Sequence, residues 1–247
     1  MIVLLSTSDT DLLSARASGA AYRLANPARL AVPDLPPLLD GATAVVVRIL
    51  GGRQAWADGL DAVTASGVPT IVLGGEVTPD AELMRLSTVP GGVVAEAHAY
   101  LAHGGPDNLR QLARFLSDAI ALTGEGFEPP KPTPTWGILE RPEKPRPTKI
   151  AILYYRAHHL AGNTGFVHAL ADAIDDAGGQ ALPVFCSSLR TAEPELIDEL
   201  KKADAIVVTV LAAGGLVPAT AGAGGTDENW DIGALASLDV PILQGLC

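Results

Sequence analysis

The segment 155–164, YRAHHLAGNT, gathers more chemically active side chains than a simple turn needs. Its polar members are Arg156, His158, His159, Asn163 and Thr164. A guanidinium can bind a carboxylate through two parallel hydrogen bonds, and imidazoles can donate to the same group. Asn163 or Thr164 is suited to cap a following helix, whose first N–H groups attract carboxylates and phosphates. The segment therefore predicts a site for an acidic ligand.

Two further segments follow predicted strands, and ligands bind at the carboxyl ends of strands in parallel sheets. Segment 186–190, CSSLR, brings the hydroxyls of Ser187 and Ser188 and the guanidinium of Arg190 beside the first segment if the strands are neighbours. Segment 211–230 is rich in Gly and Ala. A loop of that length is usually a functional lid or disordered.

Metal ligation by the histidines is the less favoured interpretation. His158 and His159 are adjacent, so in an extended chain their imidazoles point to opposite sides and one ion cannot easily take both. We favour hydrogen bonds to a ligand carboxylate or to loop carbonyls, and ligation by either imidazole stays open. His98 and His103 have poor spacing for one ion and are predicted on the solvated surface. His168 is expected to be structural, and no metal ligand or catalytic residue is assigned.

Strand and helix patterns alternate along the chain. Apolar runs predict strands at 2–5, 30–32, 43–50, 69–73, 149–155, 181–185, 205–211 and 240–246. Apolar residues at helical spacing predict helices at 11–24, around 56–63, and at 93–101, 106–122, 164–177 and 194–201. Alternating strand–helix units form parallel sheets covered by helices on both faces. The fold class is therefore α/β, with two Rossmann-like or flavodoxin-like parallel-sheet units in tandem.

A proline-rich stretch separates the two units. Residues 129–147 contain seven of the nineteen prolines, and proline fixes φ and removes a hydrogen-bond donor. We therefore predict an N-terminal α/β domain at 1–126, a linker at 127–148 and a second α/β domain at 149–247. The sequence ends at Cys247 directly after a predicted strand, so we expect the second domain to be truncated.

Composition and missing motifs exclude several function classes. The net charge of −11 leaves no basic stripe for phosphates, so no nucleic-acid partner is expected. The sequence has neither an apolar stretch long enough for a membrane span nor a basic signal region, so we expect a cytoplasmic protein without membrane contact. Cys186 and Cys247 are far apart, which predicts no disulfide framework, and Cys186 is interpreted as a small apolar residue. No GxxxxGK[ST] loop occurs, and in segment 222–227 Asp227 stands where a dinucleotide loop needs its third glycine.

Long ordered motifs give this sequence a resemblance to a known family. The stretches 152–164, ILYYRAHHLAGNT, and 181–189, ALPVFCSSL, resemble the large subunits of the CobN/magnesium chelatase family. Supporting similarity occurs at 45–52, 86–101, 104–116, 126–134, 210–215 and 240–247. The magnesium chelatase version of the first motif ends in an acid where Asn163 stands here, so YRAHHLAGN and CSS favour the cobaltochelatase branch.

The resemblance implies an activity and its partners. It implies the N-terminal part of the large, substrate-binding subunit of an ATP-dependent cobaltochelatase, a ligase that forms nitrogen–metal bonds. That enzyme inserts cobalt (Co²⁺) into hydrogenobyrinic acid a,c-diamide in aerobic cobalamin (vitamin B12) biosynthesis. Separate AAA+ motor subunits, CobS-like and CobT-like, hydrolyse the ATP, which agrees with the missing phosphate-binding loop. The family's large subunit is several times longer, so the chelation base and cobalt ligands are expected beyond Cys247 and this chain alone is expected to be inactive.

Direct substrate contact is one of two interpretations of the polar segments. Under it, the substrate-binding residues are Arg156, His158, His159, Asn163, Thr164, Ser187, Ser188 and Arg190. The other is a non-catalytic lobe that closes over substrate or docks the motor subunits. A segment 155–164 facing a concave pocket supports contact, and burial against the linker supports the lobe. The large subunit of magnesium chelatase, and a sensor or transferase built from paired Rossmann-like domains, are further alternatives.

Overall fold

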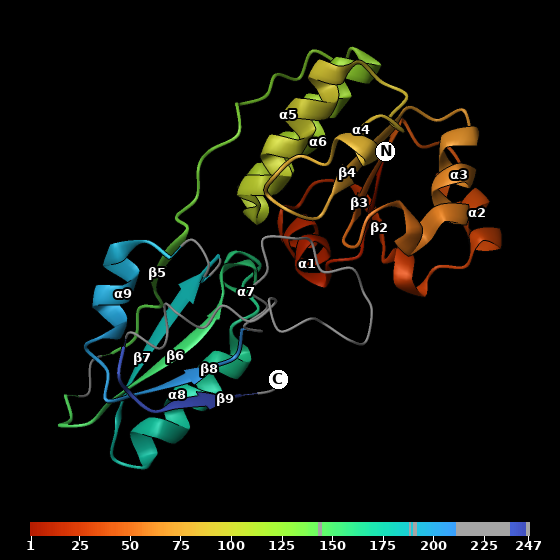
Figure 1. Ribbon diagram of the computed structural model, residues 1–247. Coiled ribbons are helices and arrows are strands. Elements are labelled where there is room, and N and C mark those ends of the chain that lie inside the picture. Colours follow the sequence, from red (N-terminus) through yellow and green to blue (C-terminus); the bar gives the residue numbers. More distant parts are fainter. Residues whose placement is uncertain (143–144, 188, 190–191, 211–237, 246–247) are drawn as a thin grey trace. The chain divides into compact units, whose positions relative to one another are not determined.

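The computed structural model describes residues 1–142, 145–187, 189, 192–210 and 238–245. The chain divides into two compact units, Met1–Thr133 and Pro134–Cys247. Each unit has its own sheet (Figure 1), with strand order β2-β1-β3-β4 in the first and β5-β7-β6-β8-β9 in the second. The expected α/β fold with two mostly parallel sheets is confirmed, and the two units do not share a sheet.

The first unit alternates strands and helices. Its strands, all parallel, are β1 (Ile2–Ser6), β2 (Tyr22–Ala25), β3 (Ala44–Ile49) and β4 (Thr70–Gly74). Its helices are α1 (Asp9–Ala17), α2 (Leu35–Leu39), α3 (Ala57–Ala65), α4 (Ala81–Met84), α5 (Gly91–His103) and α6 (Gly105–Ala121). Short 3-10 turns lie at Pro27–Arg29, Val32–Asp34 and Arg53–Trp56.

Two predictions for this unit were wrong. The helix expected at 11–24 ends at Ala17, because Gly19 adopts a φ of 72° that a helix cannot continue, and β2 follows. The strand expected at 30–32 is not one, since the prolines at 27 and 33 each begin or enter a 3-10 turn. The residues of β2 are all half-buried, so no strong apolar run marked this edge strand in the sequence.

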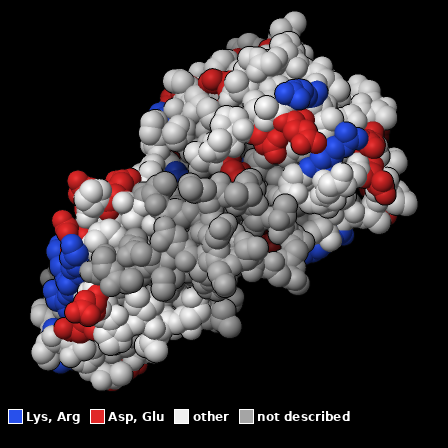
Figure 2. Space-filling view, viewed as in Figure 1, with Lys and Arg blue, Asp and Glu red and all other residues white. Residues whose placement is uncertain are grey.

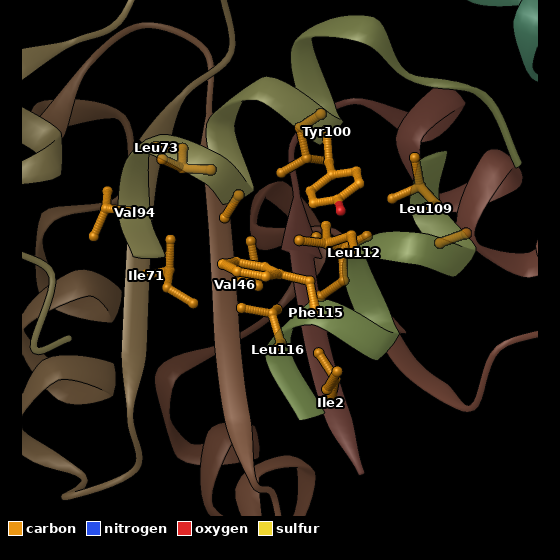
Figure 3. Close-up of a cluster of buried hydrophobic side chains, with 14 residues drawn as sticks. Ile2, Val46, Ile71, Leu73, Val94, Tyr100, Leu109, Leu112, Phe115 and Leu116 are labelled. Carbon is orange, nitrogen blue, oxygen red and sulfur yellow. The ribbon is translucent and has the colours of Figure 1, made fainter. Parts of the chain in front are cut away.

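Both faces of the first sheet carry helices, which explains why its strands read as continuous apolar runs. Successive side chains of a strand point to opposite faces. Val46 therefore packs against α5 and α6, while Val45 and Val47 pack against α2 and α3. Figure 1 shows α5 and α6 on one side of the sheet and α2 and α3 on the other. Figure 3 shows the first of these clusters, in which the Tyr100 and Phe115 rings lie 5.8 Å apart between the helices and the sheet.

In its described residues, the second unit has four parallel strands and one antiparallel edge strand. The parallel strands are β6 (Lys149–Tyr155), β7 (Gln180–Cys186), β8 (Ala205–Val208) and β9 (Ile242–Gln244). The antiparallel strand β5 (Trp136–Ile138) pairs with β7. The helices of this unit are α7 (Arg156–Leu160), α8 (Gly165–Asp176) and α9 (Pro194–Leu200). In the part of the chain that the structure describes, no helix combines the length and the apolar character that crossing a membrane requires.

Strand β5 lies inside the segment that the prolines predict as a linker. No proline occurs between Pro134 and Pro142, which leaves Thr135, Trp136 and Ile138 free to pair. A strand at an edge needs hydrogen-bond partners on one side only, so it tolerates neighbouring prolines. Part of the predicted linker is thus a structural element of the second unit.

Candidate functional site

The two polar segments predicted as a site follow neighbouring strands. Strands β6 and β7 are parallel, and Tyr155 and Cys186 are register partners at their carboxyl ends. Strand β7 lies on one side of β6 and β8 on the other, so the connection that leaves β7 passes to the far side of β6. Such a reversal of strand order is where α/β sheets commonly bind ligands. Segment 155–164 begins at this position.

The first polar segment contains a short helix and is not the loop between strand and helix that we predicted. Arg156–Leu160 forms α7, and the Asn163 N–H then donates to the His158 carbonyl at 2.9 Å. Gly162 permits the turn with a φ of 68°. Adjacent residues on a helix differ in direction by about 100°, so the two imidazoles diverge, although not to opposite sides.

His159 is held by two aromatic side chains. Its ring stacks on Phe185 with a centroid distance of 3.9 Å and an interplanar angle of 16°. Its Nδ1 lies 3.1 Å from the hydroxyl of Tyr154, whose pKa burial raises to about 12. Burial, and then the charge of Arg156, lower the pKa of His159. A neutral imidazole that accepts from the phenol at Nδ1 carries its proton on Nε2.

His158 reaches the same protonation pattern through a different partner. The side-chain nitrogen of Asn163 lies 3.0 Å from His158 Nδ1. An amide nitrogen only donates, so Nδ1 accepts and the proton of the neutral ring lies on Nε2. Burial lowers the pKa of His158, and the ring packs edge-on against Phe166 at 5.3 Å. Nε2 of His158 is therefore an N–H donor, and Nε2 of His159 is one as well when the Tyr154 hydroxyl donates to Nδ1.

Arg156 and Ser187 contact the proline-rich segment. Arg156 Nε donates to the Pro134 carbonyl at 2.6 Å. The backbone N–H and the hydroxyl of Ser187 donate to the Thr135 carbonyl, at 2.8 and 2.9 Å. These are the contacts with the linker that the lobe interpretation predicts.

The structure describes some of the remaining predicted residues and not others. Thr164 is the N-cap residue of α8, and its carbonyl accepts from the His168 N–H at 3.0 Å. Cys186 is buried as predicted, and burial raises the pKa of its thiol to about 12. His168 is exposed on α8 rather than packed in a core. Ser188, Arg190 and the segment 211–230 lie outside the described residues.

The surface prediction for His98 was wrong. Its exposed fraction is 8%, burial lowers its pKa, and Nε2 is a buried atom without a hydrogen-bond partner among the described residues. The sequence held a signal that we missed: Val94, His98 and Leu101 follow the spacing i, i+4, i+7 of one helix face, and all three are buried. A histidine inside such a stripe belongs to the core.

Beside His98, a buried ion pair occupies the carboxyl edge of the first sheet. Arg48, near the end of β3, donates through Nη1 to Asp11 Oδ1 at 2.9 Å and to the Leu101 carbonyl at 3.2 Å. Its Nη2 donates to the Gly75 carbonyl at 2.7 Å. The Ser6 hydroxyl donates to the other carboxylate oxygen of Asp11, also at 2.7 Å. Sequence reasoning placed Arg48 in a strand but assigned it no role.

Charges on the exterior are mixed in sign. On the face shown in Figure 2, Lys and Arg side chains lie beside Asp and Glu side chains in both units. Exposed pairs such as Arg53 with Asp61, at 2.8 Å, account for part of this pattern. Within the described ranges, no group of three or more His, Cys, Asp or Glu side chains could hold a metal ion.

Comparison with known proteins gives consistent matches. The family model described as CobN/Magnesium Chelatase matches residues 98–247. A protein of Sinorhizobium sp named aerobic cobaltochelatase subunit CobN is 32% identical over 77% of this chain and 18% of its own length. The protein of the same name from Pseudomonas aeruginosa is 26% identical over 100% of this chain and 21% of its own length.

A solved structure agrees with these sequence matches. The catalytic subunit of cobaltochelatase from Mycobacterium tuberculosis is 60% identical with a TM-score of 0.70, over 100% of this chain and 21% of that chain. The chain thus spans about a fifth of the length of each of these relatives. Since the family model matches the greater part of the sequence, the chain belongs to the CobN/Magnesium Chelatase family.

Proposed function

We propose that this chain forms the N-terminal part of the large, substrate-binding subunit of a cobaltochelatase. The reaction is the insertion of Co²⁺ into hydrogenobyrinic acid a,c-diamide in aerobic cobalamin biosynthesis, with loss of ring N–H protons. Support comes from the three relatives, each of which is named as a subunit of cobaltochelatase. As metal enters and nitrogen–metal bonds form, the enzyme is a ligase, and cobalt is its substrate rather than a resident cofactor.

The observation that carries a role for this part is the pair of half-buried imidazoles of His158 and His159, each held by a side chain at Nδ1. The Nδ1 atoms are engaged by Asn163 and Tyr154, so the Nε2 protons remain for a ligand. A neutral imidazole with its proton on Nε2 donates to an anion and offers no lone pair there for a metal ion. The substrate is rich in carboxylates. We therefore propose that the imidazoles bind substrate carboxylates and do not bind cobalt.

Asn163 separates this proposal from the magnesium chelatase alternative. An acid at position 163 would accept a proton from His158 Nδ1 and leave the lone pair of Nε2 outward. The amide does the reverse and turns the ring into a donor toward the ligand. Residue 163, which distinguishes the two versions of the motif, thus also decides whether Nε2 of His158 is a donor or an acceptor.

In this proposal the work is divided among subunits in the cytoplasm. AAA+ partners of the CobS and CobT type hydrolyse ATP, and the base and the cobalt ligands belong to the rest of the large subunit. This chain by itself positions substrate and is inactive.

A non-catalytic lobe is the second candidate, favoured by one observation. Arg156 and Ser187 donate to the carbonyls of Pro134 and Thr135. Those bonds fasten the segment that joins the two units, which suits a lobe that closes over substrate or docks the motor subunits. In that case the imidazoles would be structural, and their removal would leave substrate affinity unchanged.

The deciding measurement is binding of hydrogenobyrinic acid a,c-diamide to the full-length subunit, followed by absorbance or fluorescence quenching. We expect His158→Ala and His159→Ala each to weaken binding about tenfold, equivalent to about 1.4 kcal/mol. His168→Ala, which removes an exposed imidazole on α8, is the matched control and should bind like the wild type. Equal affinity in all of these proteins would overturn the proposed contact and favour the lobe.

A further inference from the structure

The two residues before β5 contact two of the residues proposed for the ligand site. The Pro134 carbonyl, two residues before β5, accepts from Arg156 at 2.6 Å. The Thr135 carbonyl accepts from Ser187 through both its backbone N–H and its hydroxyl. One short stretch of backbone therefore orients side chains at the carboxyl ends of both β6 and β7.

The same strand also reaches the stacked imidazole, through Phe185. Gly137 of β5 is the register partner of Phe185 of β7. A Cβ at Gly137 would lie 2.7 Å from Phe185 Cζ, so the ring occupies the space that any larger residue would need. That ring stacks on His159 at 3.9 Å. The chain of contact runs from Gly137 through Phe185 to His159.

Both ends of β5 are fastened by charged side chains. Before it, the carboxylate of Glu193 accepts from the Thr135 hydroxyl and, at 3.2 Å, from Trp136 Nε1. After it, Arg141 pairs with Asp172 at 2.7 Å and with Asp175 at 3.2 Å. These contacts fix where the strand sits on β7.

Residues 127–133, which precede β5, are held on the first unit by hydrogen bonds and by an aromatic contact. The Lys131 N–H donates to Asn108 Oδ1 at 2.9 Å, and the Thr133 hydroxyl donates to the His103 carbonyl at 2.6 Å. The Phe127 ring packs edge-on against Phe115 at 5.0 Å. The chain is therefore fastened to the first unit up to Thr133 and to the second unit from Pro134 onward.

We propose that β5 and the two residues before it form a positioning element, which holds Arg156, Ser187 and His159 in place. The inference rests on the proposed function, because it concerns the same site. A shift of β5 changes the space for Phe185 and with it the stacking of His159. Gly137 and Phe185 are thus positioning residues that contact no ligand themselves.

The test is Gly137→Ala in the full chain, with the His159 titration followed by NMR in the absence of ligand. The new methyl displaces the Phe185 ring, so His159 loses its stack and its pKa moves toward the ordinary value of about 6.5. Gly165→Ala is the matched control, because a Cβ there meets nothing within 4 Å. An unchanged His159 titration in a folded Gly137→Ala protein would overturn the inference.

A second variant keeps the inference testable if Gly137→Ala does not fold. Glu193→Ala removes the acceptor of Thr135 and Trp136 without altering a residue that contacts His159. We expect faster hydrogen exchange at the amides of β5 and a smaller shift of the His159 titration in the same direction. Faster exchange with an unaltered titration would contradict the coupling. Because these readouts need no ligand, the inference and the proposed substrate contact can fail separately.

Discussion

The two sheets use their carboxyl edges in opposite ways. In the first unit the strand order reverses between β1 and β3, and Arg48 and Asp11 fill that position with an ion pair whose side chains are 11% and 13% exposed. In the second unit the strand order reverses at β6, and the half-buried imidazoles of His158 and His159 lie directly after that strand. Tyr154 and Asn163 contact these rings at Nδ1 and not at Nε2. Similar topology therefore produces one closed edge, filled by an ion pair, and one edge that carries two half-buried imidazoles, here termed the open edge.

The difference teaches that topology locates a possible site and that side chains decide whether it is one. The guanidinium of Arg48 has its donors directed at Asp11, the Leu101 carbonyl and the Gly75 carbonyl. A ligand there would have to displace protein acceptors. Among the described residues, the hydrogen bonds of His158 and His159 are made at Nδ1, so a ligand at Nε2 displaces neither of them.

The largest expected effect comes from removing the ion pair between Arg48 and Asp11 at the closed edge. Asp11→Ala leaves the buried charge of Arg48 without its carboxylate, and removal of one partner of a buried pair costs about 3–5 kcal/mol. We expect the free energy of unfolding of the first unit to fall by that amount, measured by urea denaturation together with hydrogen exchange in β1 and β3.

Asp9→Ala is the matched control for the closed edge. Asp9 lies on the same helix but pairs with Arg29 at an exposed site, where the side chains are 54% and 73% accessible. Exposed pairs contribute at most about 1 kcal/mol. If Asp11→Ala costs no more than Asp9→Ala, the first edge is not held closed by its ion pair.

The sequence predicted the elements whose burial leaves a regular pattern. Strand β3, AVVVRI, is buried on both faces and therefore reads as a continuous apolar run. Strand β2 is half-buried throughout, and β5 consists of three residues among prolines, so neither carries such a run. Whether an edge strand forms depends on its partner strand, which local sequence does not contain.

The candidate site was predictable in residue type but not in geometry. The sequence of segment 155–164 contains its donors, yet one partner of Arg156 is a carbonyl 22 residues earlier in the chain. The stacking of His159 on Phe185 depends likewise on the pairing of β6 with β7. Tertiary contacts of this kind decide which donors remain for a ligand.

An intermediate effect is expected when His158, at the open edge of the second sheet, can no longer donate through Nε2. Asn163→Asp reverses the hydrogen bond to His158, so the proton moves to Nδ1 and Nε2 no longer donates. We expect the affinity of the full-length subunit for hydrogenobyrinic acid a,c-diamide to fall about tenfold. The nitrogen chemical shifts of His158 would report the change of tautomer.

Ala169→Asp is the control for the added charge, because it places a carboxylate on the exposed face of α8. It should leave both the affinity and the His158 shifts unaltered. Wild-type affinity in Asn163→Asp, with the tautomer reversed, would mean that His158 does not donate to the ligand.

The smallest expected effect is a pH dependence that arises at the closed edge. Burial lowers the pKa of His98, and the charge of Arg48 lowers it further. The unfolded chain therefore binds a proton at a higher pH than the folded chain does, and stability falls as the pH drops below about 6.5 toward the pKa of the folded state. His98→Leu should flatten this dependence in the hydrogen exchange of α5, whereas His168→Gln on the exposed face of α8 should keep it. If the stability of both variants falls equally as the pH drops, groups other than His98 take up the protons and the closed edge is not the source of the pH dependence.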